Sequence, residues 1–203
     1  MKYLKYILGI IALLGILFIA KGFLIPNITY SSEIVVNKPA KEAWAVMNDE
    51  SKTAQWLKGI KKQEHVSGEK GQVGGVTKYT FEENGQESIM VETIKALRPN
   101  EHIAMDFVME DVMEMDYQMD TSTKDGKTHI KSSTTVRGLG MFMRSMVSFM
   151  EGTMQAQEEE NMNNLKVLIE ANTTDYFPAP VVCLLYTSPS PRDQRGSRMP
   201  SSA

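Results

Sequence analysis

The chain has 203 residues, and 42% of them are hydrophobic and 23% charged. This composition excludes a collagenous, disordered or multi-span membrane protein and is sufficient for one domain with its own core. The formal net charge of −3 argues against a nucleic-acid-binding surface, because contact with phosphates requires an excess of Lys and Arg.

An apolar segment opens the sequence. Tyr6 to Ala20 contains only apolar residues, Gly and Tyr, and the apolar run resumes after Lys21 until Pro26. A hydrocarbon core of ~30 Å requires about 20 such residues in a helix, and Lys21 near one end can snorkel to the headgroups. We therefore interpret residues 1–26 as a single-pass transmembrane anchor that contacts the membrane through residues 6–25.

The same segment has a second interpretation. A cleaved signal peptide would use Lys2 and Lys5 as its basic start and Ala20-Lys21-Gly22 as a poor cleavage site. If the anchor is retained, the two lysines before it against the single Lys21 after it predict an N-terminus in the cytoplasm. The soluble domain would then be extracytoplasmic.

The composition changes abruptly at Cys183. From there to the end the sequence resembles an in-frame translation of a transposase adapter used in short-read sequencing, interrupted by a barcode-sized gap. We therefore interpret residues 183–203 as an adapter-derived artefact and residues 172–182 as a C-terminal tail whose natural end is left open. The remaining chain has no cysteine, and residues 27–182 carry 16 basic and 24 acidic residues. The folded part is therefore acidic and has neither a disulfide nor a thiol nucleophile.

Residues 27–171 have the pattern of one folded domain. Ile28–Val36 reads as a strand, and short helices are expected at Ala40–Met47 and Lys52–Leu57. Six strand-like runs follow, joined by short turns such as Asn84-Gly85: 61–66, 75–82, 87–97, 102–110, 113–122 and 128–137. Consecutive strands with short connections predict an antiparallel meander.

One long helix is expected after this meander. Apolar residues then recur every three or four positions, or at multiples of these, from Met143 to Ile169, which predicts a helix ending near Ala171. Glu158, Glu159 and Glu160 fall within it and are interpreted as a solvated face.

Local motifs support a known architecture. They are the run Glu33–Trp44 with its Asn37-Lys38-Pro39-Ala40 helix start, Asn48-Asp49, Trp56, Gly71 to Gly75, Glu92-Thr93-Ile94 and Arg98-Pro99-Asn100. In their order they resemble the SRPBCC superfamily, which includes START, polyketide cyclase/dehydrase and coenzyme-Q-binding proteins. The resemblance implies an α+β helix-grip fold, in which a curved antiparallel seven-stranded sheet surrounds the long C-terminal helix. Here it is preceded by one N-terminal transmembrane helix.

The resemblance also implies an elongated cavity between sheet and helix, a site for lipids, sterols, quinones or polyketides. Side-chain alternation along two strands and the spacing in the helix predict a methionine-rich surface there. A closed core filled by these side chains is the alternative. The candidate ligand-binding residues are Trp56, Tyr79, Met105, Phe107, Met109, Met113, Met115, Tyr117, Met119, Met143, Met146, Met150 and Met154.

The sequence offers few catalytic candidates. Asp106 and Asp116 alternate with the methionines and should lie on the opposite face, and His129 is expected on the outer face. The other two histidines, His65 and His102, are also interpreted as surface residues. Glu82, Glu87 and Glu92 surround a hairpin and are expected to face water. We therefore assign no catalytic residue, metal ligand or cofactor.

Three functions fit these features of the sequence. The first is a membrane-anchored binding module for a small hydrophobic ligand such as a lipid, quinone or polyketide-like molecule. The second is an enzyme resembling polyketide cyclases or dehydratases, which would use the same cavity. The third is an interaction domain that receives a helix or a lipidated segment and would expose a large apolar patch.

Overall fold

The computed structural model describes residues 2–83 and 85–178, so the segment 183–203 lies outside the described residues. The described residues up to Thr173 belong to one compact unit. The elements of this unit are, in chain order, α1 (Lys2–Leu24), β1 (Asn27–Val36), α2 (Ala40–Met47), α3 (Glu50–Trp56), β2 (Ile60–Ser67), β3 (Val76–Glu83), β4 (Gln86–Arg98), β5 (His102–Met109), β6 (Met113–Lys124), β7 (Lys127–Gly138) and α4 (Gly140–Glu170).

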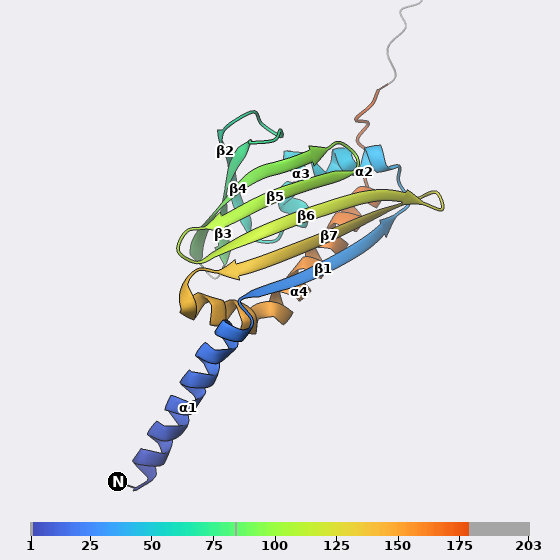
Figure 1. The fold of residues 1–203 in the computed structure, drawn as a ribbon. Helices are drawn as coiled ribbons and strands as arrows, with labels where there is room; N and C mark the ends of the chain where they lie inside the picture. Colours follow the sequence, from blue (N-terminus) through green and yellow to red (C-terminus); the bar gives the residue numbers. More distant parts are fainter. Residues whose placement is uncertain (1, 84, 179–203) are drawn as a thin grey trace, which may run out of the picture. The chain divides into compact units, whose positions relative to one another are not determined.

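The seven strands form one antiparallel sheet in the order β1-β7-β6-β5-β4-β3-β2 (Figure 1). Strands β2 to β7 are a meander, as predicted, and β1 adds to the free edge of β7. Gly85 and the Asp125-Gly126 pair have positive φ values in their turns, which permits the tight hairpins. The α+β helix-grip architecture is confirmed.

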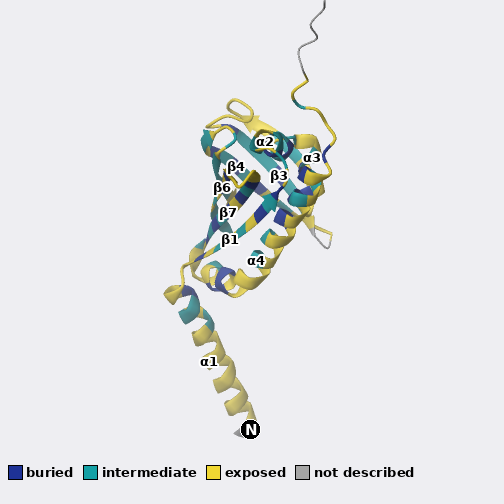
Figure 2. Ribbon diagram, turned by 90° about the vertical axis from the view of Figure 1, so that its right-hand side faces the viewer, coloured by how far each residue is buried: buried dark blue, intermediate teal, exposed yellow. Residues whose placement is uncertain are grey.

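Helix α4 covers the concave face of this curved sheet (Figure 2). In the C-terminal half of the helix, the side chains with no exposed surface are Met162, Leu165 and Ile169. In the other half, Val147 packs with Ile28 of β1 and Val136 of β7. This packing holds the helix against the β1–β7 side of the sheet and leaves the β3–β6 side free for other contacts.

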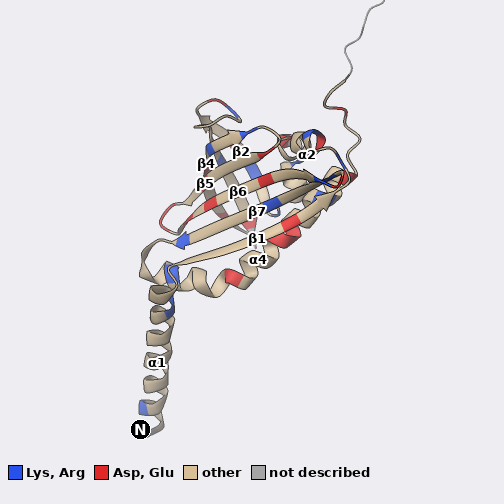
Figure 3. Ribbon diagram, turned by 45° about the vertical axis from the view of Figure 1, so that its right-hand side comes forward, with Lys and Arg blue, Asp and Glu red and all other residues tan. Residues whose placement is uncertain are grey.

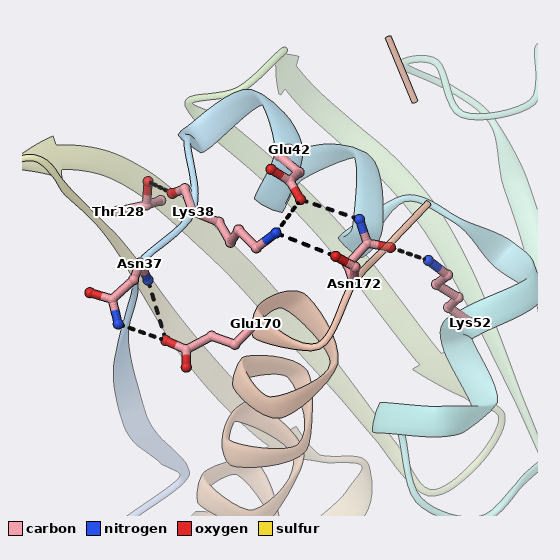
Figure 4. A network of polar contacts seen from close by, with 7 residues as sticks. All are labelled: Asn37, Lys38, Glu42, Lys52, Thr128, Glu170 and Asn172. Atoms are coloured by element: carbon pink, nitrogen blue, oxygen red, sulfur yellow. Dashed lines mark hydrogen bonds and ion pairs between the residues drawn. The ribbon is translucent and has the colours of Figure 1, made fainter. Parts of the chain in front are cut away.

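A polar network fixes the C-terminal end of α4 (Figure 4). Lys52 Nζ of α3 donates to Asn172 Oδ1 at 2.7 Å, and Asn172 Nδ2 donates to Glu42 Oε1 of α2 at 3.3 Å. Lys38 Nζ bonds both Glu42 and the carbonyl oxygen of Asn172. The hydrogen bond from Lys38 lowers the pKa of Glu42, which keeps this carboxylate charged. The network therefore joins α2, α3 and the end of α4.

Helix α1 is the one helix of the described residues that is long and apolar enough to cross a membrane. The span Tyr3–Leu24 has a mean hydropathy of 2.5, and its side chains are almost entirely exposed. Its charged residues lie near the two ends (Figure 3). A signal sequence near an N-terminus has the same properties, so the length and composition of α1 identify a candidate span only.

Candidate functional site

A cavity of about 350 Å³ lies between the concave face of the sheet, α4 and the two short helices. All seven strands contribute to its wall, in which aromatic and aliphatic side chains supply most of the surface and eleven polar or charged residues take part. Ligand pockets commonly have this composition and a volume above roughly 300 Å³. A second depression, at the turn 98–101, is lined largely by polar residues and is more open. The apolar cavity is therefore the candidate site.

The pairing of β5 with β6 builds one wall of this cavity. Met105 lies opposite Tyr117 and Phe107 lies opposite Met115, so the side chains of both strands point to the same face. The Phe107 ring packs edge-on against the Tyr117 ring at a centroid distance of 6.1 Å and contacts the Tyr79 ring of β3 at 6.4 Å. These aromatic contacts fix the wall in one arrangement.

Nine of the thirteen predicted ligand-binding residues line the cavity. They are Trp56, Tyr79, Met105, Phe107, Met113, Met115, Tyr117, Met119 and Met154. Their position fits the proposed role, and ligand binding by them stays a prediction.

The structure places Met109, Met143, Met146 and Met150 elsewhere. Met109 ends β5 at a turn, beyond the cavity wall. In α4 before residue 150, Val147 packs on Ile28 and Val136 of the sheet, whereas Ser145 packs against Gly22 of α1. Met146 and Met150 take part in neither contact face and are 41% and 39% exposed. Of the four helix methionines expected at the cavity, Met154 lines it, and the expectation for Met143, Met146 and Met150 is corrected. These three lie in the first turns of α4, which pack on α1 as well as on the sheet.

Glu92 is buried in the cavity wall, contrary to its expected exposure. It is 7% exposed, and it accepts a hydrogen bond from Tyr79 Oη at 3.1 Å. Burial, with a smaller contribution from the charge of Glu50, raises the pKa of Glu92 to about 7, although the Tyr79 bond opposes the shift. The sequence contains a signal for this position, since Glu92 alternates with Met90 and Ile94, which are both buried.

Glu158 is a second carboxyl group at the cavity, so its expected position on a solvated face is also corrected. Tyr117 Oη donates to Glu158 Oε1 at 3.4 Å, and burial raises the pKa of Glu158. Burial and the charge of Glu158 also raise the pKa of Tyr30, on the neighbouring wall, to about 12. Glu158 lies four residues from both Met154 and Met162, so it belongs to the apolar stripe of α4 by spacing.

The remaining polar groups of the cavity differ in their partners. Glu50 and Lys58 form ion pairs with Lys70 at 2.8 Å and Glu160 at 3.1 Å, respectively, on exposed side chains. Among the described residues, Glu92 and Glu158 have no ion pair. Trp56 Nε1 is buried and has no hydrogen-bond partner there. The wall of the cavity therefore contains two carboxyl groups, Glu92 and Glu158, that have no ion pair among the described residues.

The other candidates lie on the convex face. Asp106 Oδ2 pairs with Lys95 Nζ at 2.8 Å and lies opposite Asp116. Burial and the hydrogen bond with Asp106 raise the pKa of Asp116. His129 Nδ1 lies 2.9 Å from Glu33 Oε1 across the β1–β7 pair. These positions agree with the prediction from alternation, and none of these residues lines the cavity.

His102, the first residue of β5, also contacts a carboxylate: its Nδ1 atom lies 2.7 Å from Asp120 Oδ1 of β6. His65 contacts the carbonyl oxygen of Gly68 and is exposed. In the described part of the chain, no group of three or more His, Cys, Asp or Glu side chains is arranged to hold a metal ion.

Residues 27–170 match the model of the family described as polyketide cyclase / dehydrase and lipid transport. The chain belongs to this family. The match covers the sheet and α4 and supports the SRPBCC-type assignment made from the motifs. Membership supports a ligand-binding or cyclase role for the domain.

Solved structures show the same fold at low sequence identity. The chain is similar to the Zhui aromatase/cyclase from Streptomyces sp. R1128, with a TM-score of 0.59, 14% identity and coverage of 71% of this chain and 94% of that chain. The structure of the protein TTHA0849 from Thermus thermophilus gives a TM-score of 0.60 at 13% identity, and covers 72% of this chain and 100% of the other. Ara h 8.0201 gives 0.58 at 19% identity, with coverage of 72% and 99%. The search of curated proteins gave no match.

Proposed function

We propose that this protein is a membrane-anchored binding module for a small, mostly apolar molecule that carries a hydrogen-bond donor. The cavity of about 350 Å³ carries this proposal, because its apolar wall contains two carboxyl groups without a cationic partner among the described residues. The apolar wall supplies affinity through burial, at roughly 25 cal/mol per Å² before the costs of association. Lipids, quinols and polyketide-like phenols are of this class.

The polar groups of the wall select among apolar molecules. A ligand hydroxyl or amine can donate to Glu92 or Glu158, which both line the cavity. An anionic ligand, such as a fatty acid carboxylate, would bring a like charge into a poorly solvated site. The cavity therefore favours neutral or cationic ligands over anionic ones.

The anchor supports a ligand that comes from the bilayer. Helix α1 is joined to β1 through two residues, Ile25 and Pro26. A domain tethered so closely samples the membrane surface at high effective concentration. This arrangement favours uptake of molecules that partition into lipid.

The test is extraction and rebinding with the full chain in detergent. Mass spectrometry of organic extracts should identify a co-purified molecule, and a neutral quinol or sterol should raise the melting temperature more than a fatty acid of similar size. Met105→Trp fills the cavity and should abolish the shift, whereas Val108→Trp, on the outer face of the same strand, should retain it. No extracted molecule and no shift with any probe would refute the binding function.

A cyclase-like enzyme is the second candidate, and the Tyr79–Glu92 pair is the observation that favours it. A buried carboxyl group with a pKa of about 7 can both take and return a proton near neutral pH. Glu92 would remove the proton between two ketones of a polyketide, and the resulting carbanion would attack another carbonyl carbon of the same polyketide. The carbonyl π bond breaks, and the alkoxide formed would take the proton back from the Glu92 carboxyl group. Incubation with a poly-β-ketone thioester tests this function. Glu92→Gln should lower turnover by about 10²- to 10⁴-fold without loss of binding, and equal turnover would contradict it.

A further inference from the structure

The first turns of α4 expose an apolar surface beside the membrane anchor. Residues 141–150, here called the membrane-proximal segment, contain one charged residue, Arg144, and no acidic residue. Five large apolar side chains of this segment are at least 39% exposed: Met141, Phe142, Met146, Phe149 and Met150. The rest of α4 differs sharply, since it carries Glu151, Glu158, Glu159, Glu160, Lys166 and Glu170.

This segment is in direct contact with α1. The Phe18 ring stacks on the Phe149 ring at a centroid distance of 5.4 Å and lies 5.6 Å from the Phe142 ring. Gly22 permits the close approach, because a Cβ atom there would lie 2.3 Å from Ser145 Oγ. The views of Figures 1 and 2 agree in placing the start of α4 at the C-terminal end of α1.

The position of Phe18 within α1 sets the depth of the contact. Phe18 lies six residues before Leu24, the end of the candidate span, which is about 9 Å along the helix at ~1.5 Å per residue. If the span crosses the bilayer, the phenylalanine rings that contact Phe18 reach below the end of the span. The membrane-proximal segment then lies at the boundary between headgroups and acyl chains.

Lys21 is accommodated in the same contact. Its Nζ atom donates to the carbonyl oxygen of Ser148 at 2.9 Å and lies 4.0 Å from the centroid of the Phe149 ring. A backbone acceptor and an aromatic face reduce the cost of a cation at this depth. The lysine that interrupts the apolar sequence is therefore paired with the membrane-proximal segment.

We propose that the membrane-proximal segment lies in the bilayer interface and seats the domain on the lipid surface through Met146, Phe149 and Met150. The inference rests on the anchoring part of the proposed function and adds a second membrane contact to it. Amphipathic helices in the interface bury their large apolar side chains at the boundary of headgroups and acyl chains, and Arg144 supplies the one basic group of this segment. Met154 and Met113 connect this surface to the cavity, since both line the cavity and pack against the apolar cluster that contains Val147 of the segment. This contact with the lipid surface, here called the seat, therefore brings the end of the cavity that contains Met113 and Met154 next to the lipid.

Spin labels on the full chain in phosphatidylcholine vesicles test the seat. Labels are placed singly at Met146→Cys and Met150→Cys, with Cys183 replaced by Ser. Val167→Cys is the matched control, because Val167 is an apolar residue of the same helix that is 67% exposed. Collisions with oxygen should exceed collisions with a water-soluble nickel complex at positions 146 and 150, and the order should be reversed at position 167.

Three results would overturn the inference. Equal access of the nickel complex at positions 146 and 167, while a label at Leu13→Cys is protected by lipid, would retain the anchor and refute the seat. A water-exposed label at position 13 would refute both. Dipolar broadening between labels at position 146 would show that a second copy of the chain covers the segment. Ligand-induced melting shifts report on the cavity separately, so its function can fail or hold independently.

Discussion

Replacing Glu92 by Gln should stabilise the protein at neutral and alkaline pH. The carboxyl group has a pKa near 4.5 in the unfolded chain and about 7 in the fold, and a difference of this size corresponds to about 3 kcal/mol. Gln has nearly the same shape and can still accept the hydrogen bond from Tyr79, which is 3.1 Å long in the wild type. The substitution therefore removes the buried charge and keeps the packing.

The sign follows from proton binding. Below about pH 4.5 the carboxyl group is protonated in both states and contributes no difference. Between pH 4.5 and about 7 the unfolded chain releases its proton first, so the fold loses stability as the pH rises. Above this window the penalty is constant. The free energy of unfolding of the wild type should therefore fall by about 3 kcal/mol across the window relative to Glu92→Gln.

Urea unfolding of the full chain in nonionic detergent measures this difference. The signal is the fluorescence of Trp44 and Trp56, which are both buried. Glu87→Gln is the control on the same strand, because Glu87 is exposed and a hydrogen bond from Lys61 lowers its pKa. If the stabilities of the wild type and Glu92→Gln run parallel from about pH 5 to about pH 8, the buried-charge argument is refuted.

Two further substitutions test the supports of the cavity. Asn172→Ala removes the bonds that join α2, α3 and α4, and should cost about 1–3 kcal/mol in the same urea assay, whereas no change would mean that the network is replaced by water. Gly138→Ala should cost at least about 1–3 kcal/mol, because its Cβ atom would lie 2.4 Å from the backbone of Met143. The control Gly152→Ala lies in helix with open space around it and should be neutral or stabilising by about 0.5–1 kcal/mol; equal effects at both glycines would contradict the steric argument.

The fold could be predicted closely because its signals are local. Alternation and turn residues located every strand, and the predicted strand 128–137 is observed as Lys127–Gly138. The stripe that begins with Met143 predicted a helix to about residue 171, and α4 ends at Glu170. Two short helices after one strand and the motif around Pro39 then selected the architecture. These features depend on the chain neighbours of each residue, which the sequence contains.

The site was predicted in part. The sequence pattern shows which residues share one face of a strand or helix, but it does not show which other element packs on that face. The β5 and β6 methionines that line the cavity were placed correctly, since the register pairs their alternating positions. Glu92 and Glu158 were missed because charge was weighed above position, although both lie on apolar faces by spacing. Met146 and Met150 were placed wrongly because the packing of α1 on α4 is a contact over more than 100 residues of chain. Such a contact leaves no periodic signal.

Both ends of α4 are held by other elements, which limits how a guest molecule can enter. The helix is about 46 Å long at ~1.5 Å per residue, with α1 against its beginning and the Asn172 network at its end. It cannot swing away from the sheet as one rod without breaking one of these attachments. The loop between β2 and β3 is tied to α3 by the Lys70–Glu50 ion pair, and an exposed pair of this kind contributes about 1 kcal/mol or less. Gly71 of this loop borders the cavity, and the end of the loop is also held to β4, because Gly74 N–H donates to the Ile94 carbonyl oxygen at 2.8 Å and Ile94 N–H donates to the Gly75 carbonyl oxygen at 3.1 Å. Only the part of the loop before Gly74 therefore depends on the ion pair, and this part of the cavity wall is held more weakly than α4.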